Sequence, residues 1–496
     1  MRFPVRILRR SVPVPSSTTA QPGAQALPAG ARRSRALALA FAAAIVGCIV
    51  AGALWGGLPG PGRAVAAVPG VAAPARGLPQ YAAERTLGVA SCANSLCHGS
   101  AEAWPGSNVL QTEFHVWQRS DRHARAYRTL LSDKSQAIVK RMGLTEPAHR
   151  AAVCLDCHAH NAPAARRAPE FSITEGVTCE SCHGPAERWL RRHVESGASH
   201  RDNIAHGLYP TSNDIDRARL CVSCHFGNAQ KLVTHRIMAA GHPRMSFELD
   251  TFTLLGPAHF RIDADWRERK GTWDGVRAWA IGQAVASQEQ LAIFLHPQRG
   301  RDGLFPELVL FDCHACHQSM RGNRYLAARL KAGPGIVRLN DSNLLMLRLV
   351  ARRVDADAGA ALAKQIDRLH QAIAGAGDPI AQARAVYEAI DGLLPRIAAH
   401  RFAAADLQAM MEALVADGLA SQYTDYAGAE QAVFALQSLG DFLARQKAVA
   451  PDQLGPGLRR LLALVADDEK YQPVAFQAGL REFAATLQAA RRGGAK

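Results

Sequence analysis

Cys179-Glu-Ser-Cys182-His183 is one of five stretches in which a pair of cysteines runs directly into a histidine. The others are Cys154-Leu-Asp-Cys157-His158, Cys221-Val-Ser-Cys224-His225, Cys313-His-Ala-Cys316-His317 and, with four residues between the cysteines, Cys92-Ala-Asn-Ser-Leu-Cys97-His98. These stretches use ten of the eleven cysteines, although histidine makes up only 19 of 496 residues. Five such coincidences would arise by chance about once in ten million trials, so the pattern is chemical.

C-x-x-C-H is the attachment pattern of c-type haem. The two thiols add across the two vinyl groups of one haem, and the adjacent histidine gives its imidazole to the iron. A disulfide framework or a zinc-ribbon array would leave the five histidines unexplained. The sequence therefore predicts five covalently bound haem c groups. Their proximal ligands would be His98, His158, His183, His225 and His317. The wide spacing of the first pair is similar to that in small tetrahaem cytochromes of sulfate reducers, so we count it as an attachment site.

The net charge of +15 does not indicate a nucleic-acid protein. The first 66 residues hold eight arginines and no acidic residue, and removing those charges leaves +7 on the remainder. Five ferric haems with ionised propionates would contribute about −5 more. The haem-loaded protein is then only mildly basic, which predicts no nucleic-acid partner.

The N-terminus predicts export. Basic residues precede the apolar run 36–58, which is long enough to span a bilayer, and this order is typical of a signal peptide or a membrane anchor. Ala64-Val65-Ala66 is a plausible cleavage site, so both outcomes stay open. Cys48 lies inside the apolar run and is interpreted as a small buried hydrophobe. We expect a periplasmic protein, tethered to the inner membrane by residues 36–58 if the segment is not cleaved.

Composition and periodicity predict a mainly α fold with little regular sheet, organised in four parts. These are a basic segment plus export signal or anchor (1–58), a Pro/Gly/Ala linker (59–80), a pentahaem cytochrome c domain (81–325) and an α-helical bundle (340–491). Within the haem domain, helical spacing is clear over 114–131 and 275–295. The bundle is expected to contain five or six helices, over 343–354, 359–374, 379–394, 404–416, 427–446 and 458–465. We place His370 and His400 on its surface.

Two patterns between the motifs resemble a known family. After the first motif comes Trp117-Gln-Arg-Ser-Asp-Arg-His123-Ala-Arg-Ala-Tyr127, and the third is embedded in Gly176-Val-Thr-Cys-Glu-Ser-Cys-His-Gly-Pro185, with His193 eight residues further on. Over residues 88–228, these patterns and four of the motifs resemble the tetrahaem cytochrome c-554 family. Its members carry electrons away from hydroxylamine oxidation in ammonia-oxidising bacteria. The resemblance implies that His123 and His193 are distal haem ligands, and one haem of that family has an open face.

Further along, Val233-Thr-His235 to His242-Pro243 and Gly256-Pro-Ala-His259 resemble larger exported multihaem cytochromes that carry an added haem and a helical tail. The fifth haem, the wide first motif and the C-terminal bundle depart from the tetrahaem pattern. The redox partners of the family therefore cannot be carried over.

The sixth iron ligands decide between functions. A haem with two protein ligands moves electrons, whereas one with an open face can bind and reduce a small molecule. Outside the motifs the haem region has twelve histidines. His123, His193, His235, His242 and His259 are the preferred distal ligands, and His115, His160 and His314 are weaker candidates. For His235, His242 and His259 the alternative is a hydrogen bond to a propionate. Asp156, Glu180 and Asp312 are interpreted as surface or motif-loop residues rather than general acids.

Three functions follow from this inventory. The first is an electron relay between unidentified donor and acceptor proteins, which needs nothing beyond the haems. The second is an oxidoreductase acting on a small nitrogen or sulfur compound at one five-coordinate haem. The third is a haem subunit whose helical tail docks it into a larger complex. No catalytic residue is assigned, and no phosphate-binding loop, Ser–His–Asp order or H-E-x-x-H motif occurs.

Overall fold

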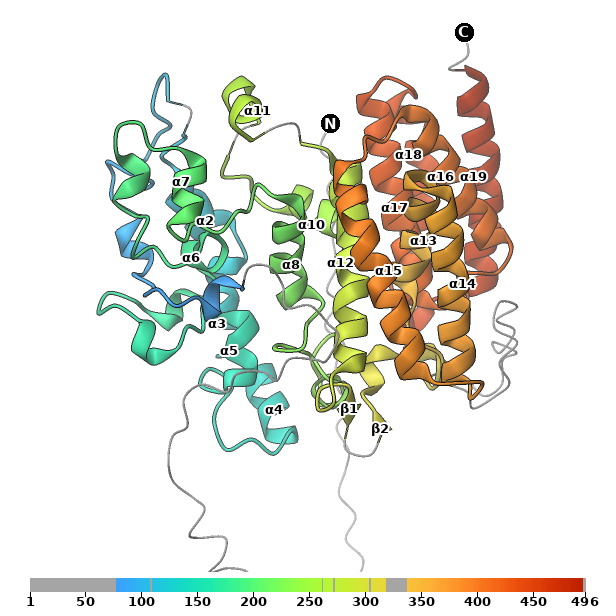
Figure 1. The fold of residues 1–496 in the computed structure, drawn as a ribbon, viewed down its shortest axis with the longest axis horizontal. Coiled ribbons are helices and arrows are strands. Elements are labelled where there is room, and N and C mark those ends of the chain that lie inside the picture. The colour runs from blue at the N-terminus through green and yellow to red at the C-terminus, as the bar shows by residue number, and fades with distance from the viewer. Residues whose placement is uncertain are drawn as a thin grey trace, which may run out of the picture. The chain divides into compact units, whose positions relative to one another are not determined.

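The computed structural model describes residues 77–107, 109–260, 262–270, 273–302, 305–317 and 337–493. Over these residues the fold is mainly α-helical, as predicted (Figure 1). The predicted export signal or anchor and nearly all of the linker lie outside the described ranges. Among the residues that are described, no helix has both the length and the apolar character needed to cross a membrane.

Short helices joined by turns make up the region from residue 77 to 270. They are α2 (Glu113–Ser120), α3 (Ala126–Thr129), α4 (Asp133–Arg141), α5 (Ala152–His158), α6 (Cys179–His183), α7 (His200–Ala205), α8 (Asp214–His225), α9 (His235–Ala239), α10 (Leu249–Leu255) and α11 (Ala264–Lys270). Single 3-10 turns connect several of them. Helices this short depend on tertiary contacts for their stability, because isolated helices below about 12 residues are marginal in water.

The prediction of one helix over 114–131 is wrong. α2 ends at Ser120, and Asp121 adopts an extended backbone with φ −82° and ψ 132°. The Asp121 carboxylate accepts the backbone N–H of His123 at 2.9 Å, which starts the 3-10 turn His123–Arg125 before α3. A short acidic side chain that bonds the backbone two residues on favours a turn over a continued helix.

α12 (Gly275–Leu295) covers the residues predicted from the sequence. Asp274 caps its N-terminus, and the Asp274 side chain accepts the N–H of Arg277. Almost every residue of α12 is buried, including Trp279 and Ile281. A helix that is apolar all round belongs inside a core. α12 packs against α8 on one side and against α13, α15 and α17 on others.

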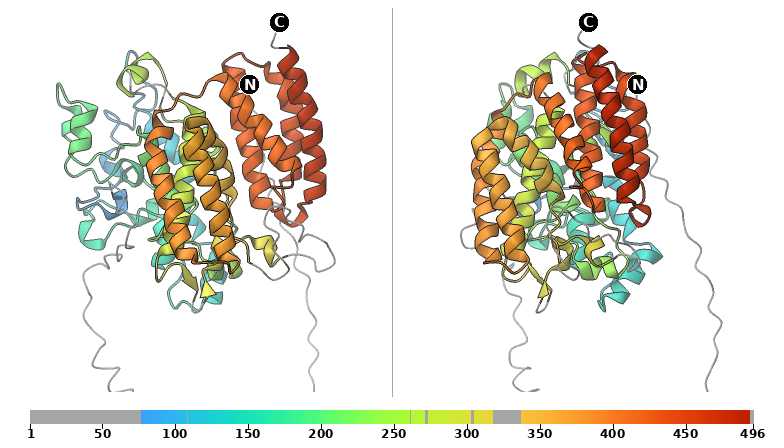
Figure 2. Two further views of the ribbon diagram at one scale, coloured as in Figure 1. Left: turned by 45° about the vertical axis from the view of Figure 1, so that its right-hand side comes forward. Right: turned by 90° about the vertical axis from the view of Figure 1, so that its right-hand side faces the viewer.

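Seven helices follow residue 340: α13 (Ser342–Val354), α14 (Ala356–Ile373), α15 (Pro379–Ala399), α16 (Ala404–Leu419), α17 (Tyr426–Arg445), α18 (Pro451–Leu464) and α19 (Pro473–Gly493). They lie alongside one another as a bundle (Figure 2), with α13 on α14, α14 on α15 and α18 on α19. α15 starts with Pro379 behind the Asp378 cap, as the Gly-Asp-Pro sequence indicates. α19 was not predicted, although Phe476, Leu480, Phe483 and Leu487 carry helical spacing and are buried.

The apolar core is distributed unevenly. One large cluster runs through α12 and the bundle and reaches α8 and α10 inside the predicted haem region. Between residues 77 and 213, the described residues form only two small apolar clusters, one around Tyr127 and Leu155 and one around Ile138 and Met142. Chains that lack a sufficient apolar core usually need a bound group to stabilise them. The N-terminal half therefore has the composition of a protein shell around large apolar cofactors.

Over the described ranges, regular sheet is confined to β1 (Arg301–Asp302) and β2 (Phe305–Pro306), which pair antiparallel. Two isolated bridges add to it, Thr86 with Arg167 and Phe311 with Leu339. The second bridge joins the segment before the fifth motif to the segment that leads into α13.

Candidate haem-binding sites

Four of the five motifs lie on helices or helical turns. The second forms most of α5, the third is α6, the fourth closes α8, and the fifth begins with the 3-10 turn Cys313–Ala315. Residues at positions i, i+3 and i+4 of a helix share one face. The helical backbone therefore presents both sulfurs and the imidazole of C-x-x-C-H on the same side.

The first motif achieves a similar closure with a wider loop. The Asn94 side chain accepts the N–H of Leu96 at 2.8 Å, and the Asn94 carbonyl accepts the N–H of Cys97 at 2.9 Å. The His98 N–H then returns to the Cys92 carbonyl at 3.1 Å, just as the His317 N–H reaches the Cys313 carbonyl at 2.7 Å. The two extra residues form a turn that restores the contact between the first cysteine and the histidine. This geometry suits haem attachment, which stays a prediction for this motif.

Four motif histidines face a second histidine from elsewhere in the chain. The ring centres lie 6.2 Å apart for His98 and His193, 5.9 Å for His225 and His123, 6.3 Å for His183 and His259, and 6.3 Å for His317 and His235. Two imidazoles bound to opposite faces of one iron would have centres about 6 Å apart. That spacing is the sum of two metal–nitrogen bonds of about 2 Å and about 1 Å from each nitrogen to its ring centre. The residues present therefore fit a haem iron held between each pair.

Hydrogen bonds at Nδ1 orient several of these rings. His98 donates to Glu113 at 3.0 Å, His123 to Asp121 at 2.9 Å, His158 to the Ala126 carbonyl at 3.2 Å and His193 to the Leu190 carbonyl. The bond to Asp121 raises the pKa of His123. A ligand histidine normally engages one nitrogen in this way and binds the metal through the other. Nε2 is therefore the nitrogen left for iron.

His158 is not in the set of four pairs. Burial lowers the pKa of the His242 imidazole. His242 donates Nδ1–H to the Pro243 carbonyl at 2.8 Å, the same arrangement that the other candidate ligands use. The backbone before it is fixed to α4, because Arg141 donates to the Ala240 carbonyl at 2.9 Å. Of the preferred distal candidates, His242 is the one that remains for the second motif.

The weaker candidates are held in other ways. His115 uses Nε2 to bond the Gly99 carbonyl at 3.1 Å, which removes its usual metal-binding nitrogen. His160 is buried, and its burial lowers its pKa to about 4, so the ring is neutral at pH 7. The His314 ring packs edge-on against Tyr426 of α17 at 6.3 Å. None of the three faces a motif histidine in the ring pairs above.

The placement of His370 on the bundle surface is wrong. Its side chain is buried, and Nε2 lies 2.9 Å from Asp341 Oδ2. The helical pattern of α14 places this residue on the inner face of the bundle. A buried imidazole needs a hydrogen-bond partner, and the Asp341 carboxylate supplies it. His400 caps the C-terminal end of α15, half-buried against Phe402.

Glu180 has a role that the sequence did not reveal. It is only 2 % exposed, and its carboxylate accepts the Thr86 hydroxyl at 2.7 Å and the backbone N–H groups of Leu87, Gly88 and Ala186 at 2.7 to 3.0 Å. Glu180 lies inside the third motif, whereas Thr86–Gly88 lead into the first. This carboxylate joins the two motifs, and since three of its partners are more than 90 residues away, no local pattern could have indicated it.

Glu307 was also missed. It is buried, and its carboxylate accepts the N–H of His235 at 2.7 Å and the N–H of Val309 at 3.2 Å. It therefore fixes the start of α9, which carries a candidate distal ligand, to the segment that leads into the fifth motif.

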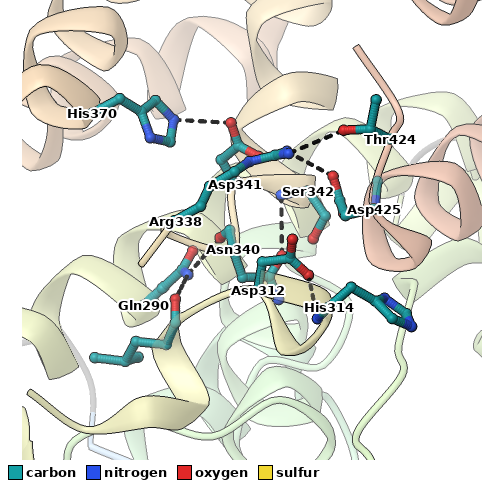
Figure 3. A network of polar contacts seen from close by, with 12 residues as sticks. Gln290, Asp312, His314, Arg338, Asn340, Asp341, Ser342, His370, Thr424 and Asp425 are labelled. Atoms are coloured by element: carbon teal, nitrogen blue, oxygen red, sulfur yellow. Dashed lines mark hydrogen bonds and ion pairs between the residues drawn. The ribbon is translucent and has the colours of Figure 1, made fainter. Parts of the chain in front are cut away.

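The fifth motif is attached to the bundle by a buried polar network (Figure 3). The backbone carbonyl of Arg338 accepts the N–H of Asp312. The Arg338 guanidinium donates to Asp425, which caps α17, at 2.6 Å and to Asp341 at 3.2 Å. Gln290 of α12 donates to the Leu310 and Asn340 carbonyls at 3.3 and 2.6 Å. Burial, together with the charge of Asp425, raises the pKa of Asp312 to about 7. The bundle therefore supports the residue that precedes Cys313.

Cysteines of different motifs also lie close to one another. Cys92 of the first motif lies beside Cys179 of the third, and Cys157 of the second lies beside Cys224 of the fourth. The Cys224 sulfur lies 3.9 Å from the Asp156 carbonyl inside the second motif. The first motif is thus adjacent to the third, and the second to the fourth.

Residues 91–184 match the family model described as cytochrome c554 and c-prime. This range holds the first three motifs and supports a relationship to the cytochrome c-554 family, with covalently bound haem c and a role in electron transfer. The fourth and fifth motifs and the bundle lie beyond it. No curated protein and no solved structure matches this chain.

Proposed function

We propose that this protein is a periplasmic c-type cytochrome that relays electrons through five covalently bound haems. The observation that carries the proposal is the set of four motif histidines, each facing a second histidine at the separation expected across one iron. Attachment would use the cysteine pairs 92/97, 154/157, 179/182, 221/224 and 313/316.

The protein's part in this function is positional. Bound haem would supply one-electron redox chemistry, and the two histidines of a pair would hold the iron so that neither face is left for a substrate. Glu113, Asp121 and the backbone carbonyls at Nδ1 fix the ring orientations and strengthen the imidazoles as ligands. Such sites keep the same ligands in both oxidation states, which suits electron transfer.

For the second motif we propose His242 as the partner of His158. The support is the loop that presents His242, which Arg141 holds to α4, and the hydrogen bond that engages His242 Nδ1 as in the other candidate ligands. All five irons would then have two histidine ligands.

Location and partners follow from the N-terminus and the cofactors. Attachment of c-type haem belongs to the periplasmic side, and the basic, apolar N-terminus would deliver the chain there, either cleaved or tethered by residues 36–58. The partners would be a donor protein and an acceptor protein that exchange single electrons.

Intact-protein mass with peptide mapping, followed by a reductive titration, tests the cofactor content. We expect five haems, one on each motif peptide, and five electrons taken up per chain. A chain with fewer haems, or with zinc on a motif, would contradict the proposal.

The second candidate function is an oxidoreductase acting on a small nitrogen or sulfur compound. It is favoured by one observation: among the residues that the structure describes, no second histidine ring faces His158 as one faces each of the other four motif histidines. If His242 does not bind, the haem of the second motif would have one open face. Substrate-dependent turnover that disappears when His158 is replaced would support this alternative.

A further inference from the structure

The contacts between motifs have an order. We number the sites 1 to 5 by motif along the chain. Site 1 touches site 3, because Glu180 of the third motif holds residues 86–88 before the first. Electron tunnelling falls steeply with distance, so the neighbours of each site decide the path that an electron takes.

Site 3 continues to site 4. The Val177 N–H, two residues before Cys179, donates to the His123 carbonyl at 3.1 Å, and the ring of His123 faces His225 of the fourth motif. Gly176 approaches the same carbonyl so closely, with φ +78°, that an added Cβ would lie 2.7 Å from it. Site 4 in turn adjoins site 2 through the contact of Cys224 with Asp156.

Site 5 extends from the site 2 and site 4 pair. Lys231 donates to the Cys224 sulfur at 3.1 Å, and four residues later His235 faces His317 of the fifth motif. Residues 231–235 therefore connect site 5 to site 4, which adjoins site 2.

Exposure distinguishes the ends of this order from its middle. Cys97, Cys313 and Cys316 are exposed, whereas all six attachment cysteines of sites 2, 3 and 4 are partly buried; Cys92, the other cysteine of site 1, is buried. Leu96, beside Cys97, is 74 % exposed, and His317 is exposed as well. Sites 1 and 5 are thus the ones that a partner protein can approach.

We propose that electrons cross this protein in the order site 1, site 3, the pair of sites 4 and 2, and site 5, or the reverse. Sites 1 and 5 are the two ports where partners exchange electrons. Site 5 is the site added to the four of the tetrahaem pattern. Gln290 of α12, Arg338 and Asp425 hold it against the bundle. The proposal rests on the proposed function, because it requires haems at all five motifs.

Photochemical injection in the haem-loaded full chain tests the order. A ruthenium photoreductant is attached to a single introduced cysteine, with Cys48→Ser in every variant. The cysteine is either Ala101→Cys, at an exposed position three residues after His98 beside port 1, or Leu308→Cys beside port 5. Leu308 is 38 % exposed and lies five residues before Cys313. Val474→Cys on α19, at an 80 % exposed position away from every motif, is the matched control.

Ferric electron paramagnetic resonance can tell the sites apart after freeze-quenching. The angle between the two ligand planes is 13° at site 1, 86° at site 3, 84° at site 4 and 34° at site 5. Parallel and perpendicular imidazoles give different g anisotropies in low-spin ferric haem. From Ala101→Cys, the parallel-type signal should bleach first, the perpendicular signals next and the site 5 signal last. From Leu308→Cys the sequence should reverse. Injection from Val474→Cys should be at least tenfold slower.

The same bleaching sequence from both labels, or early bleaching of site 5 from Ala101→Cys, would overturn the order. Equally fast injection from Val474→Cys would overturn the assignment of ports. Loss of a haem from the wild-type chain would instead contradict the proposed function, so the two failures are distinguishable.

Discussion

Replacing Glu180 by alanine tests whether one buried carboxylate joins the first and third motifs. The change leaves the backbone N–H groups of Leu87, Gly88 and Ala186 without an acceptor in a buried position. Hydrogen bonds to a charged group contribute about 1.5 to 3 kcal/mol each. Counting the three backbone bonds at the low end, we expect a loss of about 4 to 5 kcal/mol, or about 10 to 15 °C in Tm for a region of this size.

Thermal unfolding followed by circular dichroism in the Soret band measures this loss in the haem region. Glu180→Gln keeps one acceptor oxygen and should show roughly half the shift. Glu187→Gln is the matched control, because Glu187 pairs with Arg85 at the surface and should produce no measurable change. If Glu180→Ala unfolds at the wild-type temperature, the carboxylate does not hold the two motifs together.

Three further predictions follow from the histidine pairs and the bundle. His123→Ala should leave His225 as the lone axial ligand and produce one high-spin haem that binds carbon monoxide; a fully low-spin spectrum would remove His123 from the pair. Burial, together with Asp425, raises the pKa of Asp312 to about 7, so its carboxylate is neutral below that pH and negative above it. The reduction potential of the fifth haem should therefore fall as pH rises from 6 to 8, and Asp312→Asn should flatten this dependence in a redox titration; an unchanged slope would refute the link. Removing residues 340–496 uncovers the apolar faces of α12 and deletes Asp341 and Asp425. We therefore expect peptide mapping to show loss of the fifth haem with the first three retained. Retention of all five haems would show that the bundle is not part of that site.

The candidate haem-attachment motifs could be predicted from the sequence because their chemistry is local. C-x-x-C-H needs only five consecutive residues and a helical turn, and α5, α6 and the end of α8 supply that turn. Long helices could be predicted for the same reason, since α12 and, in the bundle, α15 each carry their cap and apolar spacing within one segment. The mainly α fold class is confirmed on this basis.

The remaining features depend on residues far apart in the chain. Glu180 and Glu307 act on partners more than 70 residues away, and neither lies in a pattern that marks it. His370 was assigned to the surface because its partner, Asp341, lies on a different segment. The helix expected over 114–131 was broken by a single side-chain bond from Asp121, a competition that apolar spacing does not register. The division of the chain at 325–340 stays a prediction, with α12 packed among the helices that follow it.

The central claim is that every iron in this protein is held between two histidines. Carbon monoxide binding to the fully reduced, haem-loaded protein, counted per chain, tests it most directly. We predict no binding and a ferric spectrum that is entirely low-spin. Binding of one carbon monoxide per chain would contradict the claim. It would indicate an open iron at the haem bound by His158 and would favour reduction of a small molecule as the function.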